Sequence, residues 1–191
     1  RKHLHLAMYE GDDIRVRGYE RTGEDIKKWI NPNDFFQEQT PKRTFIADDE
    51  FGGDIYDFSF EIPDGHEVEY VPQTKALNIY KTKGLGSALE RSSIFIRHFN
   101  AEVFLTLASV EIHSKEDLVI GKENYTARRY DIEKSDEEDE FKDQPSWRHV
   151  RHIVTDFKEK DGYSQFNVVA KNPDFDMGVY EAFLASIQVN K

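Results

Sequence analysis

The sequence predicts an α+β domain, a largely antiparallel β-sheet covered by helices as an α/β/α sandwich, preceded by an N-terminal arm. Residues 58–62 alternate apolar and polar side chains, which is the period of a strand with one buried face. Several similar short segments follow, separated by turn residues, and this spacing predicts an antiparallel meander. Near the C-terminus, apolar residues recur at helical spacing between Asp176 and Ile187, so we expect a helix packed on the sheet.

The first 44 residues differ from the rest because they carry few aliphatic side chains and many charges. We predict a partly ordered peripheral arm over residues 1–44 and a main domain over residues 45–191. Within the arm, residues 3–9 alternate like a short strand. A helix is predicted over residues 22–30, since Thr22 is a suitable N-cap with an acidic residue three positions later.

The main domain is organised around the strand over residues 58–62. Pro63 ends this strand because proline has no N–H to donate to a sheet, and Asp64-Gly65 then turns the chain. Asn100 is a suitable N-cap for a short helix, while residues 110–112 are left open between helix and strand. The other strands are predicted over residues 67–71, 76–80, 93–99, 122–134, 145–157 and 163–171.

The composition excludes several classes of function. Acidic residues outnumber basic ones 37 to 26, which argues against binding to a nucleic-acid backbone because phosphates require clustered Lys and Arg. The chain has no cysteine, so disulfides, thiolate zinc sites and cysteine nucleophiles are excluded. No apolar run approaches the roughly 20 residues that a membrane-spanning helix needs.

Three segments together resemble the PsbP-like family of extrinsic photosystem proteins and bacterial lipoproteins, a fold that also occurs in a nuclear import factor that binds the GTPase Ran. These segments are Phe58-Ser59-Phe60-Glu61-Ile62-Pro63, Phe166-Asn167-Val168-Val169 and Phe183-Leu184-Ala185-Ser186-Ile187. The resemblance covers about residues 45–190, and it departs from the family where His66-Glu67-Val68 replaces a stretch that usually holds a Trp. It implies a non-enzymatic binding or assembly module and transfers no specific functional residue.

Trp147, His149 and Arg151 form the candidate binding surface that the sequence offers. If residues 145–157 are a strand, these three side chains share one face, whereas His152 lies on the other and cannot share a metal with His149. A cationic face beside Trp147 suits an anionic or aromatic partner. Pairing of these cations with acidic side chains on neighbouring strands is the alternative, and it carries more weight.

Other polar clusters make weaker sites. The acidic run over residues 136–140 lacks the ligand spacing of a calcium loop and is interpreted as a solvated hairpin tip. His3 and His5 have a spacing that can chelate zinc, but no third ligand is identifiable. Gly84-Leu85-Gly86-Ser87 lacks the Lys of a phosphate-binding loop. No nucleophile elbow surrounds the serines at Ser92, Ser93 and Ser186.

We therefore expect a non-catalytic, extracytoplasmic binding or assembly module of the bacterial lipoprotein type that docks a protein partner and is itself monomeric. The chain starts at Arg1 without an initiator Met, which fits a processed product from which a signal peptide or membrane anchor has been removed. The alternative is a small-molecule or divalent-metal-binding protein, or a hydrolase, with a site near His149, Arg151 and the acidic tip. No cofactor, metal ligand or catalytic residue is predicted.

Overall fold

The computed structural model describes residues 8–9, 29–30, 42–47, 55–100, 110–134, 143–158 and 165–189. The chain divides into two units, Arg1–Pro41 and Lys42–Lys191. In the first unit, β1 (Met8–Tyr9) pairs antiparallel with β2 (Trp29–Ile30). The helix predicted over residues 22–30 is therefore wrong at its C-terminal end, because Trp29 and Ile30 form a strand that pairs with β1. Of the rest of the predicted arm, residues 42–44 belong to the second unit, and the other residues lie outside the described part of the chain.

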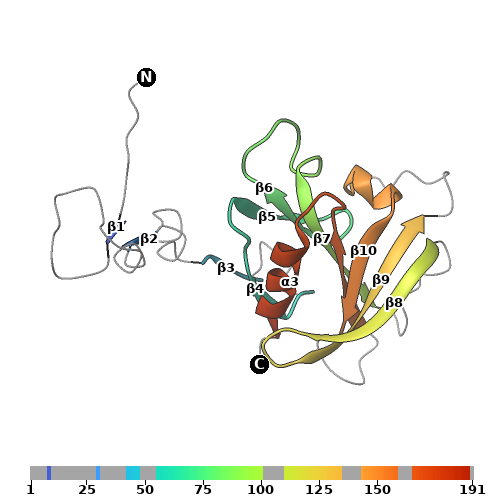
Figure 1. Ribbon diagram of the computed structural model, residues 1–191. Helices are drawn as coiled ribbons and strands as arrows, with labels where there is room; N and C mark the ends of the chain where they lie inside the picture. The colour runs from blue at the N-terminus through green and yellow to red at the C-terminus, as the bar shows by residue number, and fades with distance from the viewer. Residues whose placement is uncertain are drawn as a thin grey trace. The chain divides into compact units, whose positions relative to one another are not determined.

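The second unit is built on a seven-stranded sheet in which every neighbouring pair is antiparallel (Figure 1). Its strand order is β5-β6-β7-β11-β10-β9-β8. The strands are β5 (His66–Val71), β6 (Ala76–Lys81), β7 (Ser92–Asn100), β8 (Val110–Ile120), β9 (Tyr125–Lys134), β10 (His152–Phe157) and β11 (Gln165–Lys171). A separate three-stranded sheet has the order β12-β4-β3, with β12 (Gln188–Val189), β4 (Phe58–Glu61) and β3 (Thr44–Ile46).

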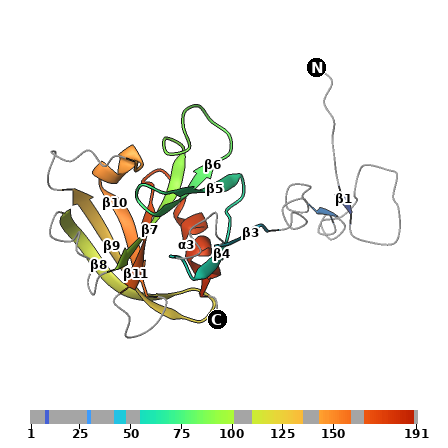
Figure 2. The same cartoon turned by 180° about the vertical axis from the view of Figure 1, so that it is seen from behind.

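The predicted α/β/α sandwich is wrong, because strands dominate the described residues and helices do not cover both faces of the sheet. The α-helix α3 (Met177–Ser186) lies against one face, beside β4, as the two opposite views show (Figures 1 and 2). Since β3 and β12 pair with both edges of β4, this small sheet shares with α3 the face that helices were expected to cover. The 3-10 helix η2 (Ser146–His149) is the other helical segment described.

Two local predictions also change. Asn100 is the last residue of β7 and pairs with Gln165, so it does not cap a helix, and the residues of that predicted helix lie outside the described part of the chain. The segment that the sequence left open belongs to β8, which forms a long hairpin with β9 around a turn at residues 121–124. No helix among the described residues is long and apolar enough to cross a membrane.

Aromatic side chains fill the main core between the sheet, β4 and α3. Phe60 of β4 stacks on Phe45 of β3 with ring centroids 4.8 Å apart, and its ring lies 4.9 Å from that of Phe183 on α3. Tyr180 of α3 is fully buried, and its hydroxyl donates to the Thr155 hydroxyl at 2.9 Å or the Val169 carbonyl at 3.0 Å. The helix is thereby fixed to the sheet by packing and by a satisfied buried hydroxyl.

The opposite face of the sheet carries a second set of buried apolar side chains. Trp147 of η2 and Phe99 of β7 pack against this set. Its buried members are Tyr130, Ile132, Val154, Val168 and Ala170. The second face is therefore not a solvated surface, and the segment containing η2 contributes to its cover.

Two β-bulges interrupt the ladders of the seven-stranded sheet. Between β6 and β7 the register skips Ser93, and between β8 and β9 it skips His113. A bulge places one extra residue on one strand and redirects its side chain. Both extra residues carry polar groups, and both direct them at other polar side chains.

We expect Gly121→Ala to lower the free energy of unfolding by about 3 kcal/mol, measured by urea denaturation. Gly121 has a φ of 72°, and an added Cβ would lie 2.6 Å from the carbonyl oxygen of Ile187. Gly65→Ala is the matched control, because Gly65 has a φ of 70° but open space around its Cβ position. It should cost only about 1 kcal/mol for backbone strain. Equal losses in the two variants would contradict the packing of this hairpin turn against the end of α3.

Candidate functional site

The predicted binding surface at Trp147, His149 and Arg151 does not form one face of a strand. Trp147 and His149 belong to η2, and the strand β10 begins only at His152. The Arg148 N–H donates to the Pro145 carbonyl and the Val150 N–H to the Trp147 carbonyl, which winds this segment into 3-10 turns. The alternation that grouped the three side chains therefore does not apply to them.

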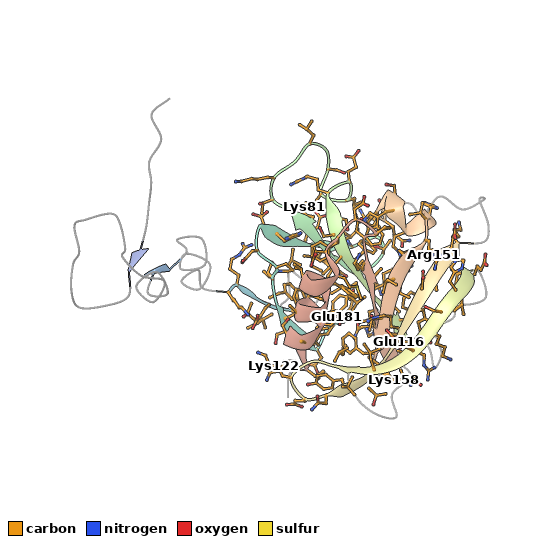
Figure 3. The ribbon with its side chains drawn as sticks, viewed as in Figure 1. Lys81, Glu116, Lys122, Arg151, Lys158 and Glu181 are labelled. Atoms are coloured by element: carbon orange, nitrogen blue, oxygen red, sulfur yellow. The ribbon has the colours of Figure 1, made fainter. Side chains whose placement is uncertain are left out.

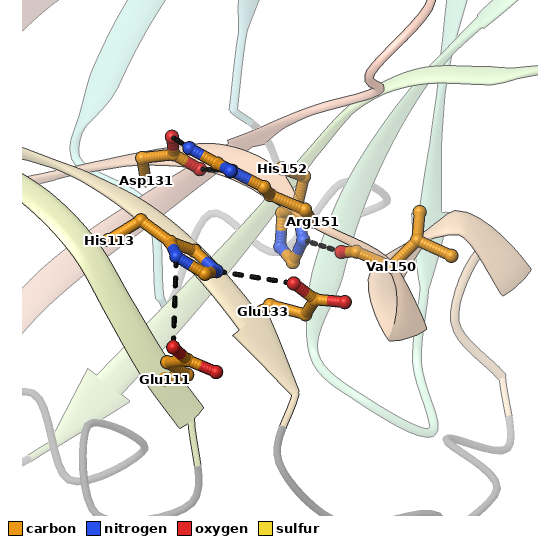
Figure 4. Close-up of polar contacts among 7 residues, drawn as sticks. All are labelled: Glu111, His113, Asp131, Glu133, Val150, Arg151 and His152. Carbon is orange, nitrogen blue, oxygen red and sulfur yellow. Dashed lines mark hydrogen bonds and ion pairs between the residues drawn. The ribbon is translucent and has the colours of Figure 1, made fainter.

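Arg151 is paired with an acidic side chain (Figure 4). Its Nε lies 3.0 Å from one carboxylate oxygen of Asp131, and its Nη2 lies 2.6 Å from the other. This two-pronged hydrogen bonding lowers the pKa of the Asp131 carboxyl below its usual value. In the same view, the Nε2 of His113 lies 3.2 Å from Glu133. The contact between Arg151 and Asp131 is charge pairing with a neighbouring strand, the alternative that the sequence also offered.

The remaining candidates do not assemble a metal site within the described residues. No three His, Asp or Glu side chains in that part of the chain are arranged to hold a metal ion. The acidic run over residues 136–140 and the pair His3 and His5 lie outside the described residues. In the two-glycine loop, the Ser87 N–H donates to the Glu90 carboxylate at 2.6 Å, so that donor is already used.

Arg148, which the sequence did not single out, is buried against the second face of the sheet with 8% of its surface exposed. Its Nη1 lies 2.9 Å from Nε2 of His152. The other ring nitrogen of His152 lies 2.7 Å from the Val150 carbonyl, which can only accept, so Nδ1 carries the proton and Nε2 accepts from Arg148. Burial, and then the charge of Arg148, lower the pKa of His152 to about 3. His152 is thus a neutral partner and does not itself compensate the charge of Arg148.

Arg97 brings a second guanidinium to this face. It belongs to β7, and its guanidinium carbon lies 4.8 Å from the centre of the Phe99 ring. Burial lowers the pKa of Arg97. Burial, and then the charge of Arg97, lower the pKa of Arg148 to about 10. Arg97 and Arg148 are called the arginine pair below.

The arginine pair has no carboxylate partner among the described residues. The Nε atoms of both side chains are buried and make no hydrogen bond there. Uncompensated buried charge is costly, and proteins normally pair it or bind a counter-ion to it. The arrangement is suited to an oxyanion, because guanidinium groups present planar N–H donors that match carboxylate and phosphate oxygens.

Sequence reasoning missed the arginine pair, although one signal was present. Arg97 interrupts an otherwise strongly apolar segment, Ser93-Ile94-Phe95-Ile96-Arg97, that was predicted to be a central strand. A charged residue within such a strand requires a partner or a function. The proximity of Arg148 depends on the 3-10 turns at η2, which no periodicity in the sequence indicates.

Comparison with known proteins adds no family. No family model and no curated protein matches the chain. A solved structure of a protein from Bacteroides thetaiotaomicron VPI-5482 is similar, with 10% sequence identity and a TM-score of 0.33. The match covers 80% of this chain and 50% of the other, so this chain spans about half the length of that protein. A likeness this weak carries no argument about function, and the resemblance to the PsbP-like family stays an expectation.

Proposed function

We propose that the main domain is a binding module whose ligand or partner supplies an oxyanion, a carboxylate or a phosphate group, to the arginine pair. The observation that carries this proposal is a buried Arg148 beside a half-buried Arg97, with both Nε atoms buried and no carboxylate partner for either among the described residues. This keeps the class of function expected from the sequence, a module that docks a partner. It moves the proposed recognition from His149 and Arg151 to the arginine pair on the second face of the sheet.

The surroundings of the arginine pair would strengthen such an interaction. Phe99 and Trp147 pack on the same apolar cluster, so an anion bound there would be partly shielded from water. Coulomb attraction is several-fold stronger in such a setting than in bulk solvent. Arg148 is also held in place by its hydrogen bond to His152, so less side-chain entropy is lost when an anion binds. The Nε of Arg148 is buried and makes no hydrogen bond within the described residues.

Small oxyanions should therefore stabilise the folded protein. We expect phosphate, sulfate or acetate, compared with chloride at equal ionic strength, to raise the free energy of unfolding. An anion present at ten times its Kd should add about 1.4 kcal/mol. Thermal unfolding in each salt measures the effect. Arg97→Met should abolish it, and should itself be neutral or stabilising in chloride because it removes a half-buried charge that has no carboxylate partner among the described residues.

Arg128→Met is the matched control. Arg128 is exposed and its Nε lies 2.7 Å from Asp117, so its removal should leave the anion effect unchanged. Equal stabilisation of the wild-type protein and of Arg97→Met by the same anion would refute the proposed site. Equal stability of the wild-type protein in all four salts would also count against it.

A further inference from the structure

Ser93 and His66 form a hydrogen-bonded pair at a different place, on the β5 side of the main sheet. Ser93 is the extra residue of the bulge in β7, and His66 is the first residue of β5, two strands away in the sheet. The Ser93 hydroxyl lies 2.9 Å from Nε2 of His66. A hydroxyl beside an imidazole within hydrogen-bonding reach is the starting arrangement of nucleophilic catalysis.

The tautomer of His66 is fixed by its second contact. Its Nδ1 lies 2.8 Å from the backbone carbonyl of Asp64. Because a carbonyl can only accept, Nδ1 carries the ring proton, and Nε2 presents its lone pair to the Ser93 hydroxyl. Burial lowers the pKa of His66, which keeps the ring neutral and able to take a proton at neutral pH. The Ser93 hydroxyl therefore donates its hydrogen bond to His66, and the Asp64 carbonyl orients the imidazole ring.

Hydrogen bonds hold the backbone at Ser93 in place. The Ser92 carbonyl accepts from the side-chain amide of Asn172 at 2.8 Å and from the indole of Trp147 at 3.1 Å. The Ser93 carbonyl accepts from the Asn172 N–H at 2.9 Å. Trp147, which the sequence offered as a binding residue, thus positions the bulge that carries Ser93. Such support from surrounding hydrogen bonds is what preorganised sites require.

Ser93 lines a cleft of about 250 Å³. The base of the loop between β6 and β7 contributes Lys81, whose position Figure 3 shows, together with Lys83 and Arg91. Within the described part of the chain, neither lysine has an ion-pair partner. Asn172 and Asp174 line the other wall. The cations outnumber the acidic groups of the lining, so the cleft favours a ligand that carries negative charge.

We propose that Ser93 and His66 are the nucleophile and the general base of an esterase acting on small carboxylic esters that bear an anionic group. Ser93 Oγ bonds to the ester carbonyl carbon while its proton passes to Nε2 of His66. The bond from this carbon to the alkoxy oxygen then breaks, and the alcohol leaves with that proton. A water molecule attacks the acyl-serine in the same way, which releases the acid and restores Ser93. Lys81 and Lys83 hold the anionic group of the substrate.

This activity is independent of the arginine pair, so either proposal can fail without the other. The test is to treat the full chain with a fluorophosphonate probe, which phosphonylates activated serines, and to map the adduct by mass spectrometry. We expect one adduct per chain, located at Ser93, formed at least tenfold more slowly in His66→Gln. The rate should fall as the pH is lowered through the pKa of His66. Ser87→Ala, which removes an exposed serine of the neighbouring loop, should label like the wild-type protein.

The same preparation can be assayed with a pair of p-nitrophenyl esters, the neutral acetate and the anionic hemisuccinate. We expect Lys81→Met to raise KM severalfold for the hemisuccinate and to leave KM for the acetate unchanged. The adduct is mapped on the wild-type protein, so the test does not depend on a Ser93 variant that folds. Absence of any adduct, or an adduct at another serine, would mean that the contact between Ser93 and His66 only ties β7 to β5.

Discussion

Phe58→Ala should lower the free energy of unfolding by about 3–5 kcal/mol, the loss typical of a large-to-small change at a buried aromatic position. Phe58 has none of its surface exposed. Its ring lies edge-on to Tyr56 at 5.6 Å and to Phe157 of β10 at 5.4 Å. The side chain thus joins the small sheet to the large one, so its removal leaves a cavity between the two layers.

Urea denaturation followed by circular dichroism measures this loss. The control is Leu85→Ala, since Leu85 is 97% exposed and should change stability by no more than about 0.5 kcal/mol. A loss below about 1 kcal/mol for Phe58→Ala would mean that β4 does not pack on the main sheet.

Acid should destabilise the protein through His152 by about 3 kcal/mol between pH 7.5 and pH 4.5, since one pKa unit corresponds to about 1.4 kcal/mol. The folded-state pKa of His152 is lowered from 6.5 to about 3, mainly by burial. The unfolded chain therefore binds a proton below pH 6.5 that the folded chain does not bind. The contribution of the neutral His152 ring to folding stability is present in full above that pH. It is lost progressively as the pH falls toward the folded-state pKa of His152. Arg148 and Asp131 are the charged groups that act on the ring.

His152→Gln isolates this contribution, because glutamine can still accept a hydrogen bond from Arg148 but does not titrate. Carboxylates that titrate in the same range are common to both proteins and cancel in the difference. We expect the wild-type protein to lose about 3 kcal/mol more than the variant over this pH range. Parallel pH profiles for the two proteins would show that the ring is not buried in its neutral form.

The sequence was informative wherever structure depends on neighbouring residues. The strand β4 ends before Pro63, with Phe58 and Phe60 on its buried face, as the alternation predicts. The C-terminal helix was also predicted, and the Asp176 side chain caps it by accepting from the Val179 N–H at 2.9 Å. Val179, one of the apolar residues in that predicted helix, is exposed. Periodicity and capping depend on residues close in sequence, so they predict single strands and helix ends reliably.

The layering could not be predicted because it depends on which strands pair. Alternation shows that β4 has a buried face, but not that β3 and β12, from near the start and the end of the domain, occupy its two edges. The small sheet β12-β4-β3 therefore covers part of the face of the main sheet on which α3 packs. A family resemblance based on core-packing motifs carries no information about such pairing.

The predictions of functional sites failed for a related reason. Strand periodicity grouped Trp147 with His149 and Arg151, but the 3-10 turns of η2 break that period. Ser93 was dismissed because no motif surrounds it, and its contact with His66 arises from a bulge, which shifts the register by one residue. Arg97 of β7 acts on Arg148 only because η2 packs on the second face of the folded sheet. Bulges and tertiary proximity leave little trace in a single sequence.

The central claim, that the arginine pair binds an oxyanion, is tested most directly by isothermal titration calorimetry of the full chain with phosphate and, separately, with acetate in a chloride buffer. We predict saturable binding of at least one of these anions with one site per chain, retained in Arg128→Met and lost in Arg97→Met. Absence of saturable heat for both anions, or identical isotherms for the wild-type protein and Arg97→Met, would contradict the claim.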